Sequence, residues 1–428
     1  MIHRNVREWE SLSYGTGDDR IPLWAAERLA AVASRSPLGG ANGGSIITLG
    51  HKALRAGQVV GILAADGVEL EILPKIDVKG DSKVATGQIR RKLVHMLAVA
   101  FEMEIDGGAL TGVDPQRDHL LEILIGLFSK KLVAVVRQGM PRQYLTQEDD
   151  LRALRGRLDM ARQFSLHAAN PSRLACRFDE LSPDIALNQV MKAAVTRLRR
   201  LARTPDNLRR LAELDFAYAD VSTVPLHSLR WDALQIDRTN AHWRNLLAMA
   251  RLLLGDQFQT SAMGEQPGFS LLFEMNTLFE QYVGQLLRRA MGSSGLSVHL
   301  QGGGRYCLTS MEDGRQIFQT RPDILIKRGE QVVHIIDTKW KRIGGRVDDP
   351  KRGVSQSDVY QMMAYAQVYS GCELLTLLYP HHSDSAVDEG IIGEHRIGAG
   401  TSQLRLASIA LDGAIDTVTS ALQRLAAA

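Results

Sequence analysis

The chain has 428 residues, of which 45% are hydrophobic and 23% are charged, and its formal net charge is +3. This length is sufficient for two or three domains with buried cores. The near balance of charge excludes the overall basicity that would by itself indicate nucleic-acid binding.

Cysteine usage and hydropathy predict a reducing, cytoplasmic setting. The three cysteines, Cys176, Cys307 and Cys372, are far apart and form no Cys-x-x-Cys pair, which argues against a disulfide framework and a structural zinc site. The N-terminus lacks the apolar core of a signal peptide. Because Lys130 and Lys131 interrupt the most apolar long stretch, we expect no membrane span.

Residues 1–80 are predicted to form a β-rich segment. Gln58–Leu63 and Val68–Leu73 flank an Asp-Gly dipeptide, which is typical of a β-hairpin. In the second strand apolar residues alternate with Glu69 and Glu71, so we expect one packed face and one solvated face.

Residues 81–260 are predicted to form a helical domain. Four segments place apolar residues at three- and four-residue spacing: Gln88–Phe101, His119–Val136, Ile185–Ala202 and His242–Leu254. The pattern is compatible with either an elongated stalk or a compact bundle, because helical periodicity alone does not distinguish them.

Residues 261–428 are predicted to form an α/β domain, and a β-hairpin over Thr320–Lys339 is its most informative feature. If the turn is centred on Glu330, antiparallel pairing places Asp323 directly opposite Asp337. The same register pairs Leu325 with Ile335 and Lys327 with Val333.

Two carboxylates placed in this way need a cation between them. Cβ atoms of directly paired residues lie roughly 4.5–5.5 Å apart, and like charges at that separation oppose folding. Since side chains alternate along a strand, Lys339 projects on the same face as Asp337. The alternative is that Asp337 and Lys339 form a solvated strand face, with Asp323 a turn residue after Pro322.

Two helices are predicted to flank the hairpin. The first, Leu271–Ala290, carries Glu280 at the edge of its apolar stripe, where a carboxylate can turn toward a site. The second, Asp358–Tyr369, presents Gln361 and Tyr365 on one face at i and i+4.

Further elements complete this domain. Ser357 is a candidate N-cap for the second helix, Leu374–Tyr379 is predicted to be a strand, and Ile415–Leu425 is predicted to be a helix that packs back on the domain.

This order of parts resembles the PD-(D/E)XK nuclease core. The matching motifs are Pro322-Asp323 and Asp337-Thr338-Lys339, and Gln361-x-x-x-Tyr365 is similar to an additional motif of the RecB-like branch. The resemblance implies an α/β fold class: a β-rich N-terminal segment, a helical middle region, and a C-terminal mixed sheet flanked by helices.

A closer resemblance is to the McrC family, the nuclease subunits of McrBC modified-cytosine restriction systems. It covers almost the whole chain. The segments that carry it are Arg55–Gly61, Glu71–Asp77, Leu154–Leu158, Phe178–Leu181, Leu278–Tyr282, Arg321–Ile326, Val333–Lys341, Ser355–Tyr365 and Leu377–His381.

DNA hydrolysis by this set of residues requires Mg²⁺, with Mn²⁺ as the alternative ion. We expect the metal ligands to be Asp323 and Asp337, helped by the Thr338 carbonyl, with Glu280 binding a second ion or ordering a water. Lys339 is expected to orient the attacking water or offset phosphate charge. By resemblance to similar nucleases, Gln361 and Tyr365 steady the site or the DNA backbone.

The chain lacks the Gly-x-x-x-x-Gly-Lys-Ser/Thr motif of nucleotide-binding loops. The McrC resemblance therefore implies a separate AAA+ GTPase motor of the McrB type, whose hydrolysis this chain stimulates and into which its N-terminal half docks. The implied substrate is double-stranded DNA with modified cytosine.

Two other functions remain open. One is a non-catalytic activator of an AAA+ ring, although such a decayed site usually loses at least one of the four residues Glu280, Asp323, Asp337 and Lys339, all of which are present. The other is a RecB-like nuclease or a transposon end-nicking subunit that acts on DNA ends.

Overall fold

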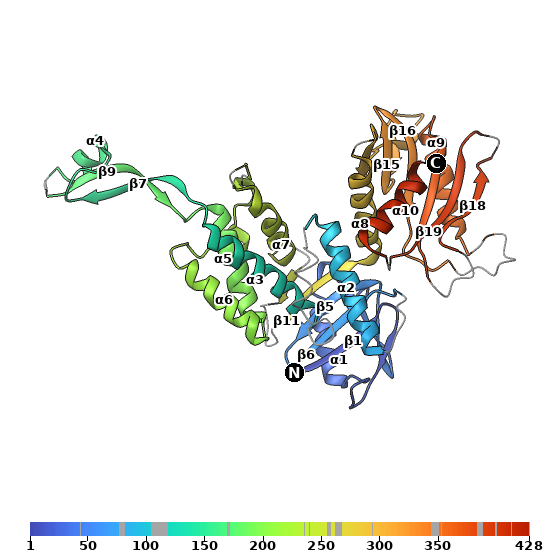
Figure 1. The fold of residues 1–428 in the computed structure, drawn as a ribbon, viewed down its shortest axis with the longest axis horizontal. Coiled ribbons are helices and arrows are strands. Elements are labelled where there is room, and N and C mark those ends of the chain that lie inside the picture. The colour runs from blue at the N-terminus through green and yellow to red at the C-terminus, as the bar shows by residue number, and fades with distance from the viewer. Residues whose placement is uncertain are drawn as a thin grey trace. The chain divides into compact units, whose positions relative to one another are not determined.

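The computed structural model divides into two compact units, Met1–Leu120 with Asp256–Ala428, and Leu121–Gly255 (Figure 1). This grouping differs from the expected three-part division at residues 80 and 260, because the first and last parts of the chain share one unit. The described residues are 1–42, 44–76, 82–103, 119–168, 172–234, 236–238, 240–254, 258–261, 268–292, 294–343, 351, 353–382, 388–398, 400–411 and 413–427.

The N-terminal part of the first unit is built on a five-stranded sheet in the order β1-β6-β5-β11-β10. Its strands are β1 (Ile2–Arg7), β5 (Val59–Ala65), β6 (Val68–Leu73), β10 (Phe258–Ser261) and β11 (Gly268–Glu274). The predicted β5–β6 hairpin is present, with Gly67 at a φ of 78° in its turn. Helix α1 (Leu23–Ala33) packs on this sheet, and its buried face completes the hydrophobic core.

A smaller antiparallel sheet lies beside this core, in the order β2-β4-β3. Its strands are β2 (Ser11–Ser13), β3 (Ile47–Leu49) and β4 (Ala53–Ala56), and a short 3₁₀ helix spans Pro37–Asn42.

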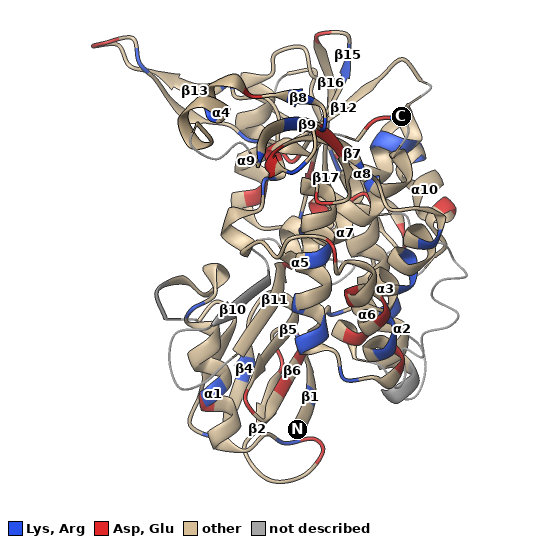
Figure 2. Cartoon of the chain, turned by 90° about the vertical axis from the view of Figure 1, so that its left-hand side faces the viewer, with Lys and Arg blue, Asp and Glu red and all other residues tan. Residues whose placement is uncertain are grey.

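The expectation that β6 has a solvated face is wrong, because every residue of this strand is buried. Glu71 is only 1% exposed, and it accepts two hydrogen bonds of 2.8 and 2.6 Å from Arg90 on helix α2 (Ser82–Ala100). The acidic residues of β6 therefore lie inside the protein. Over the chain as a whole, acidic and basic residues are interspersed (Figure 2). The alternating pattern of the strand does not reveal that a helix with a matching charge covers its polar face.

The C-terminal part of the first unit contains a six-stranded mixed sheet in the order β12-β15-β16-β17-β19-β18. Strands β16–β17 and β17–β19 are parallel, and the other neighbours are antiparallel. The strands are β12 (Ser297–Leu300), β15 (Ile324–Arg328), β16 (Gln331–Thr338), β17 (Leu374–Pro380), β18 (Gly390–Arg396) and β19 (Gln403–Ile409).

Three helices flank this sheet. Helices α8 (Met275–Met291) and α10 (Ile415–Ala427) pack against each other, and α9 (Gln356–Val368) packs against β17. The predicted C-terminal helix and the predicted strand β17 are confirmed. An exposed hairpin, β13 (Tyr306–Thr309) with β14 (Gln316–Gln319), precedes β15.

The first predicted flanking helix begins later than expected. Residues 271–274 belong to β11, which pairs with β5, and α8 starts only at Met275. Strand β11 is almost wholly buried and therefore apolar, and its apolar residues run directly into those of the following helix. The sequence pattern for this reason does not show where the strand ends and the helix begins. The N-cap of α9 is Ser355 rather than Ser357, because the Ser355 side chain accepts a hydrogen bond from the Asp358 N–H.

The predicted hairpin of Asp323 and Asp337 is present with one change in register. Leu325 pairs with Ile335 as expected, but Lys327 pairs with Val332 instead of Val333. The turn is a residue tighter than expected, since Arg328 pairs with Gln331, and an irregularity after Ile326 restores the register near the acids.

The second unit consists of helices and a β-arm. The predicted helices are present as α3 (Leu120–Gln138), α5 (Ala186–Leu201) and α7 (Arg244–Leu254), and α6 (Pro205–Ala217) joins them. Helix α5 packs on both α6 and α7. No described helix of the chain is long and apolar enough to cross a lipid bilayer.

The β-arm of this unit was not predicted. It comprises β7 (Gln143–Leu151), β8 (Arg157–Leu158), α4 (Met160–Leu166) and β9 (Leu174–Ser182), and it extends away from the helices of the unit (Figure 1). Strand β7 is mainly exposed and contains five polar residues in succession from Thr146. Without a buried face, the strand lacks the apolar alternation by which it could be predicted.

Candidate active site

The two acids of the β15–β16 hairpin lie at the same end of the strand pair. Ile324 pairs with Ile336, so Asp323 and Asp337 occupy the next positions toward that end. Asp323 Oδ2 accepts hydrogen bonds of 2.8 Å from both the backbone N–H and the hydroxyl of Thr338. Asp337 is fully buried, at 0% exposure, and it pairs with Leu377 of β17 on the other side of β16.

Lys339 links the acids to helix α9. Its Nζ forms an ion pair of 2.5 Å with Asp337 Oδ2 and donates a hydrogen bond of 3.0 Å to Gln361 Oε1. Gln361 Nε2 in turn donates to the Tyr365 hydroxyl at 2.7 Å, and that hydroxyl donates to the Arg321 carbonyl at 3.3 Å. The structure thus brings the predicted Gln361 and Tyr365 together with the predicted lysine.

Glu280 of α8 is the third acid of this cluster and, like Asp337, is buried, at 8% exposure. Burial, together with the negative charges of Asp323 and Asp337, raises the pKa of Glu280 to about 7, against the opposing effects of a Gln301 hydrogen bond and of Lys339. Glu280 is therefore close enough to both hairpin acids for their charges to act on it.

The hairpin acids also resist ionisation. Burial and the charge of Asp323 raise the pKa of Asp337 to about 6, although Lys339 opposes this effect. Burial likewise raises the pKa of Asp323 despite its hydrogen bonds from Thr338. Burial alone would lower the pKa of Lys339, but the surrounding aspartates outweigh it and hold that pKa above its usual value.

This charge distribution fits a divalent cation. Two buried carboxylates, Asp337 and Glu280, and the half-buried Asp323 lie near one lysine. Asp337 Oδ1 and Glu280 Oε1 are buried atoms without a hydrogen-bond partner among the described residues. Carboxylate oxygens are the ligands that Mg²⁺ prefers. The oxygens of the three acids do not gather within 4.8 Å of one another, since the one described group that meets that distance is His3, Glu69 and His119.

Two neighbouring residues that the sequence did not indicate support this site. The Gln301 N–H donates to the Asp323 carbonyl at 2.8 Å. Trp340, which follows Lys339, donates from its indole nitrogen to Glu8 Oε1 at 2.6 Å. Gln301 precedes three consecutive glycines, a composition that indicates close backbone approach, whereas nothing in the local sequence marks Glu8.

A sequence model of the McrBC 5-methylcytosine restriction system component family matches residues 54–380. The chain belongs to this McrBC family. The family expected from the sequence is thus confirmed, and the match spans the hairpin acids, Lys339, Glu280 and the α9 pair.

Relatives of this McrBC chain are distant in sequence. It is 22% identical over 313 residues to the type IV methyl-directed restriction enzyme EcoKMcrBC of Escherichia coli (strain K12). The aligned region covers 69% of this chain and 87% of that protein.

Two solved structures from Thermococcus gammatolerans share the fold. One is a half-complex from a tetradecameric assembly of McrB AAA+ hexamers with bound McrC, with a TM-score of 0.74, 20% identity and 99% coverage of both chains. The other is an McrBC complex, with a TM-score of 0.54, 23% identity, and coverage of 68% of this chain and 88% of that chain.

Proposed function

We propose that this chain is the DNA endonuclease subunit of a modification-dependent, type IV restriction system, with a PD-(D/E)XK-type catalytic site. The observation that carries the proposal is the cluster of Asp323, Asp337 and Lys339 at one end of a hairpin, with Glu280 beside it. Buried and half-buried acids with raised pKa values beside a lysine are typical of a functional site rather than of a solvated strand face.

The residues of this site have two proposed roles, metal binding and orientation of the attacking water or the phosphate. Asp323, Asp337, Glu280 and the Thr338 carbonyl would hold Mg²⁺, or Mn²⁺ in its place. When bound, such an ion neutralises charge on phosphate oxygens and makes a bound water more acidic. Lys339 orients the attacking water or offsets charge on the phosphate.

Gln361 and Tyr365 act through Lys339. Gln361 accepts the hydrogen bond from Lys339 Nζ and is itself oriented by Tyr365, so the two side chains fix the direction of the amine. Asp358 of the same helix forms an ion pair of 3.0 Å with Lys341.

The motor partner proposed for this chain is an AAA+ GTPase. The sequence has no nucleotide-binding loop motif of its own, and a similar solved structure contains McrB AAA+ hexamers with bound McrC. In this scheme the motor recognises the modified base, and the present chain stimulates its hydrolysis and cuts double-stranded DNA.

The β-arm of the second unit is the surface that we assign to motor docking. Six large apolar side chains of the arm are exposed: Tyr144, Leu154, Met160, Phe164, Leu166 and Leu181. Exposed apolar side chains gathered on one element indicate a protein interface. This assignment places docking within the expected helical middle region, but on strands and a short helix that the sequence did not predict.

The decisive experiment combines the purified chain with its AAA+ partner, GTP, Mg²⁺ and methylated circular plasmid. We expect double-strand cuts with the wild type and none with Asp337→Ala. The matched control is Glu330→Ala, which removes an exposed carboxylate from the turn of the same hairpin and should cut normally. Wild-type cutting by Asp337→Ala would disprove the catalytic assignment.

The same assay separates the other two functions. A non-catalytic activator would accelerate GTP hydrolysis without any cut, in the wild type as in Asp337→Ala. A nuclease specific for DNA ends would degrade linear, unmethylated DNA and leave the circular plasmid intact.

A further inference from the structure

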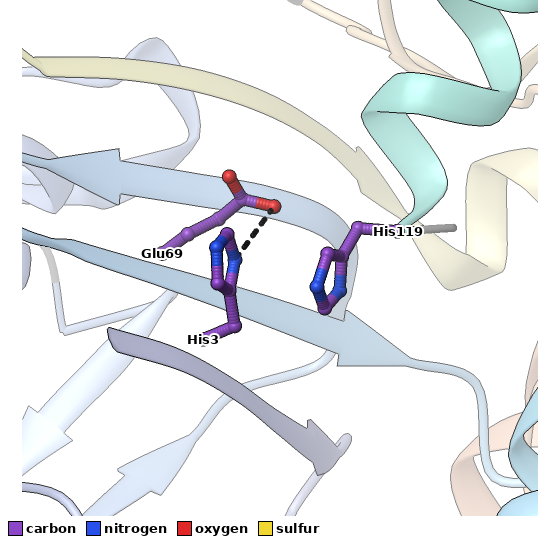
Figure 3. Close-up of side chains that lie close together, drawn as sticks. All are labelled: His3, Glu69 and His119. Carbon is purple, nitrogen blue, oxygen red and sulfur yellow. Dashed lines mark ion pairs between the residues drawn. The ribbon is translucent and has the colours of Figure 1, made fainter. Parts of the chain in front are cut away.

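His3, Glu69 and His119 form a cluster away from the candidate active site (Figure 3). His3 lies on β1 and Glu69 on β6, and the two residues are direct partners in the parallel pairing of these strands, so their side chains lie on the same face of the sheet. His119 immediately precedes α3 and approaches them from outside the sheet.

The three side chains present their donor atoms to one another. One ligand atom of each lies within 4.8 Å of the others, and His3 Nδ1 is 3.9 Å from Glu69 Oε1. The rings of His3 and His119 are stacked, with centroids 4.2 Å apart and planes 11° apart. Because the two ring planes are nearly parallel, their in-plane nitrogen lone pairs do not converge on one point, and binding of a shared ion requires one ring to turn out of the stack.

Glu69 is a buried acid beside the two histidines. It is 5% exposed, and its single ion pair among the described residues is the one with His3. The neighbouring Glu71, by contrast, is matched by Arg90 through hydrogen bonds. His3 Nδ1 is buried without a hydrogen-bond partner among the described residues, so this nitrogen lone pair remains to be satisfied.

We propose that His3, Glu69 and His119 bind a divalent transition metal of the Zn²⁺ type. Two imidazoles and one carboxylate form a donor set that suits zinc and leaves a fourth position for water. Zinc–nitrogen bonds of about 2.0–2.1 Å place tetrahedral ligand atoms about 3.4 Å apart. His3 Nδ1 and Glu69 Oε1 are already 3.9 Å apart, and rotation of the His119 ring out of the stack would turn its nitrogen toward the same ion.

The proposed metal has a structural consequence. It joins β1, β6 and the residue that leads into α3, where Leu120 N already donates to Glu71 Oε1 at 3.2 Å. The ion would therefore hold His119, next to Leu120, on the sheet at a second point. It differs from the hairpin site in its ligands, which include imidazole nitrogen as well as carboxylate oxygen.

Metal binding to the full-length chain, freed of ions with a chelator, tests this proposal. Co²⁺ serves as the spectroscopic probe, and Zn²⁺ affinity is measured by calorimetry. We expect one high-affinity Zn²⁺ per chain and visible Co²⁺ absorption with nitrogen ligation. We expect Zn²⁺ affinity to fall by more than about 10-fold in each of three variants, His3→Ala, His119→Ala and Glu69→Gln. Loss of a residue that only supports a metal ligand already costs about 10-fold or more, and loss of a ligand itself should cost at least as much.

Two controls make the result specific. His51→Ala removes an exposed histidine and should bind Zn²⁺ like the wild type. Asp337→Asn should also retain the ion, because the hairpin acids are not its ligands. The proposal is overturned if the wild type shows no nitrogen-ligated Co²⁺, if all three cluster variants keep wild-type affinity, or if Asp337→Asn alone abolishes binding.

The wild-type Co²⁺ spectrum decides the question even if one of the cluster variants does not fold. Thermal unfolding of the wild type gives a further measure, because a ligand that binds the native state raises the unfolding midpoint. We expect Zn²⁺ to raise it for the wild type and for His51→Ala, and to leave it unchanged for His119→Ala.

Discussion

Glu8 accepts a hydrogen bond of 2.6 Å from the Trp340 indole nitrogen, although 332 positions separate the two residues in the sequence. Trp340 follows Lys339, and its ring lies 5.3 Å from that of Phe279, the residue before Glu280. The β-rich start of the chain therefore supports two of the proposed catalytic residues at once.

Loss of this bond should weaken both stability and cleavage. Glu8→Ala leaves a buried indole N–H without its acceptor, which costs about 1–3 kcal/mol of unfolding free energy. Trp340→Phe removes the donor as well, so the double variant should be less destabilised than the sum of the two single variants. Chemical denaturation measures the free energies, and additive effects would contradict the coupling.

Asp337→Asn should separate stability from activity. The raised pKa of Asp337 reflects a charge that the folded state accommodates poorly, so in the presence of a chelator the neutral amide should not destabilise the fold. Cleavage, by contrast, should fall by at least about 10³-fold, a loss of roughly 4 kcal/mol of transition-state stabilisation. Unfolding and plasmid cleavage on the same preparation check both expectations, and a large loss of stability would refute the first.

Glu280 should make metal-free stability depend on pH. Its pKa rises from 4.5 to about 7 on folding, so between these values the native state retains a proton that the unfolded chain has lost. Its contribution is therefore most favourable below pH 4.5 and declines as the pH rises to about 7.

Glu280→Gln removes this dependence. With a chelator present, the variant should match the wild type near pH 4.5 and exceed its stability above pH 7 by on the order of 1–3 kcal/mol. Thermal unfolding across this pH range measures the difference, and a difference independent of pH would argue against the buried, protonated carboxyl.

The buried pair of Glu71 and Arg90 should be essential to the first unit. Glu71→Gln removes the carboxylate that offsets a buried guanidinium, and we expect a loss of about 3–5 kcal/mol. The matched control is Glu213→Gln, which breaks an exposed ion pair with Arg137 and should cost at most about 1 kcal/mol. Equal effects of the two substitutions on chemical unfolding would show that burial does not govern these pairs.

The β-arm can be tested for motor binding without altering the core. Phe164 is 68% exposed, so Phe164→Ser should change stability by less than about 0.5 kcal/mol. If the arm docks the motor, affinity for the AAA+ partner should fall by more than about 10-fold. Phe216→Ser on α6, which is 85% exposed, is the matched control and should bind normally.

Local sequence patterns predicted much of the candidate site. The apolar run of β16 and the turn after Arg328 predicted the hairpin, because strand pairing across a short turn is a local property. The expected register near Asp323 and Asp337 holds only because an irregularity after Ile326 offsets a turn that is one residue tighter than predicted. The i, i+4 spacing similarly placed Gln361 with Tyr365. The β-arm was missed because β7 is exposed on both faces and so lacks an apolar pattern.

The sequence by itself determined the family, the hairpin acids with their lysine, and the principal helices, since each depends on residues close together in the chain. Only the tertiary structure decided that Glu71 is buried against Arg90, that β11 pairs with β5, and that Glu8 supports Trp340. These contacts join segments far apart in the chain. Their energy comes from burial and from matched polar groups, which leave no periodic signal in either segment alone.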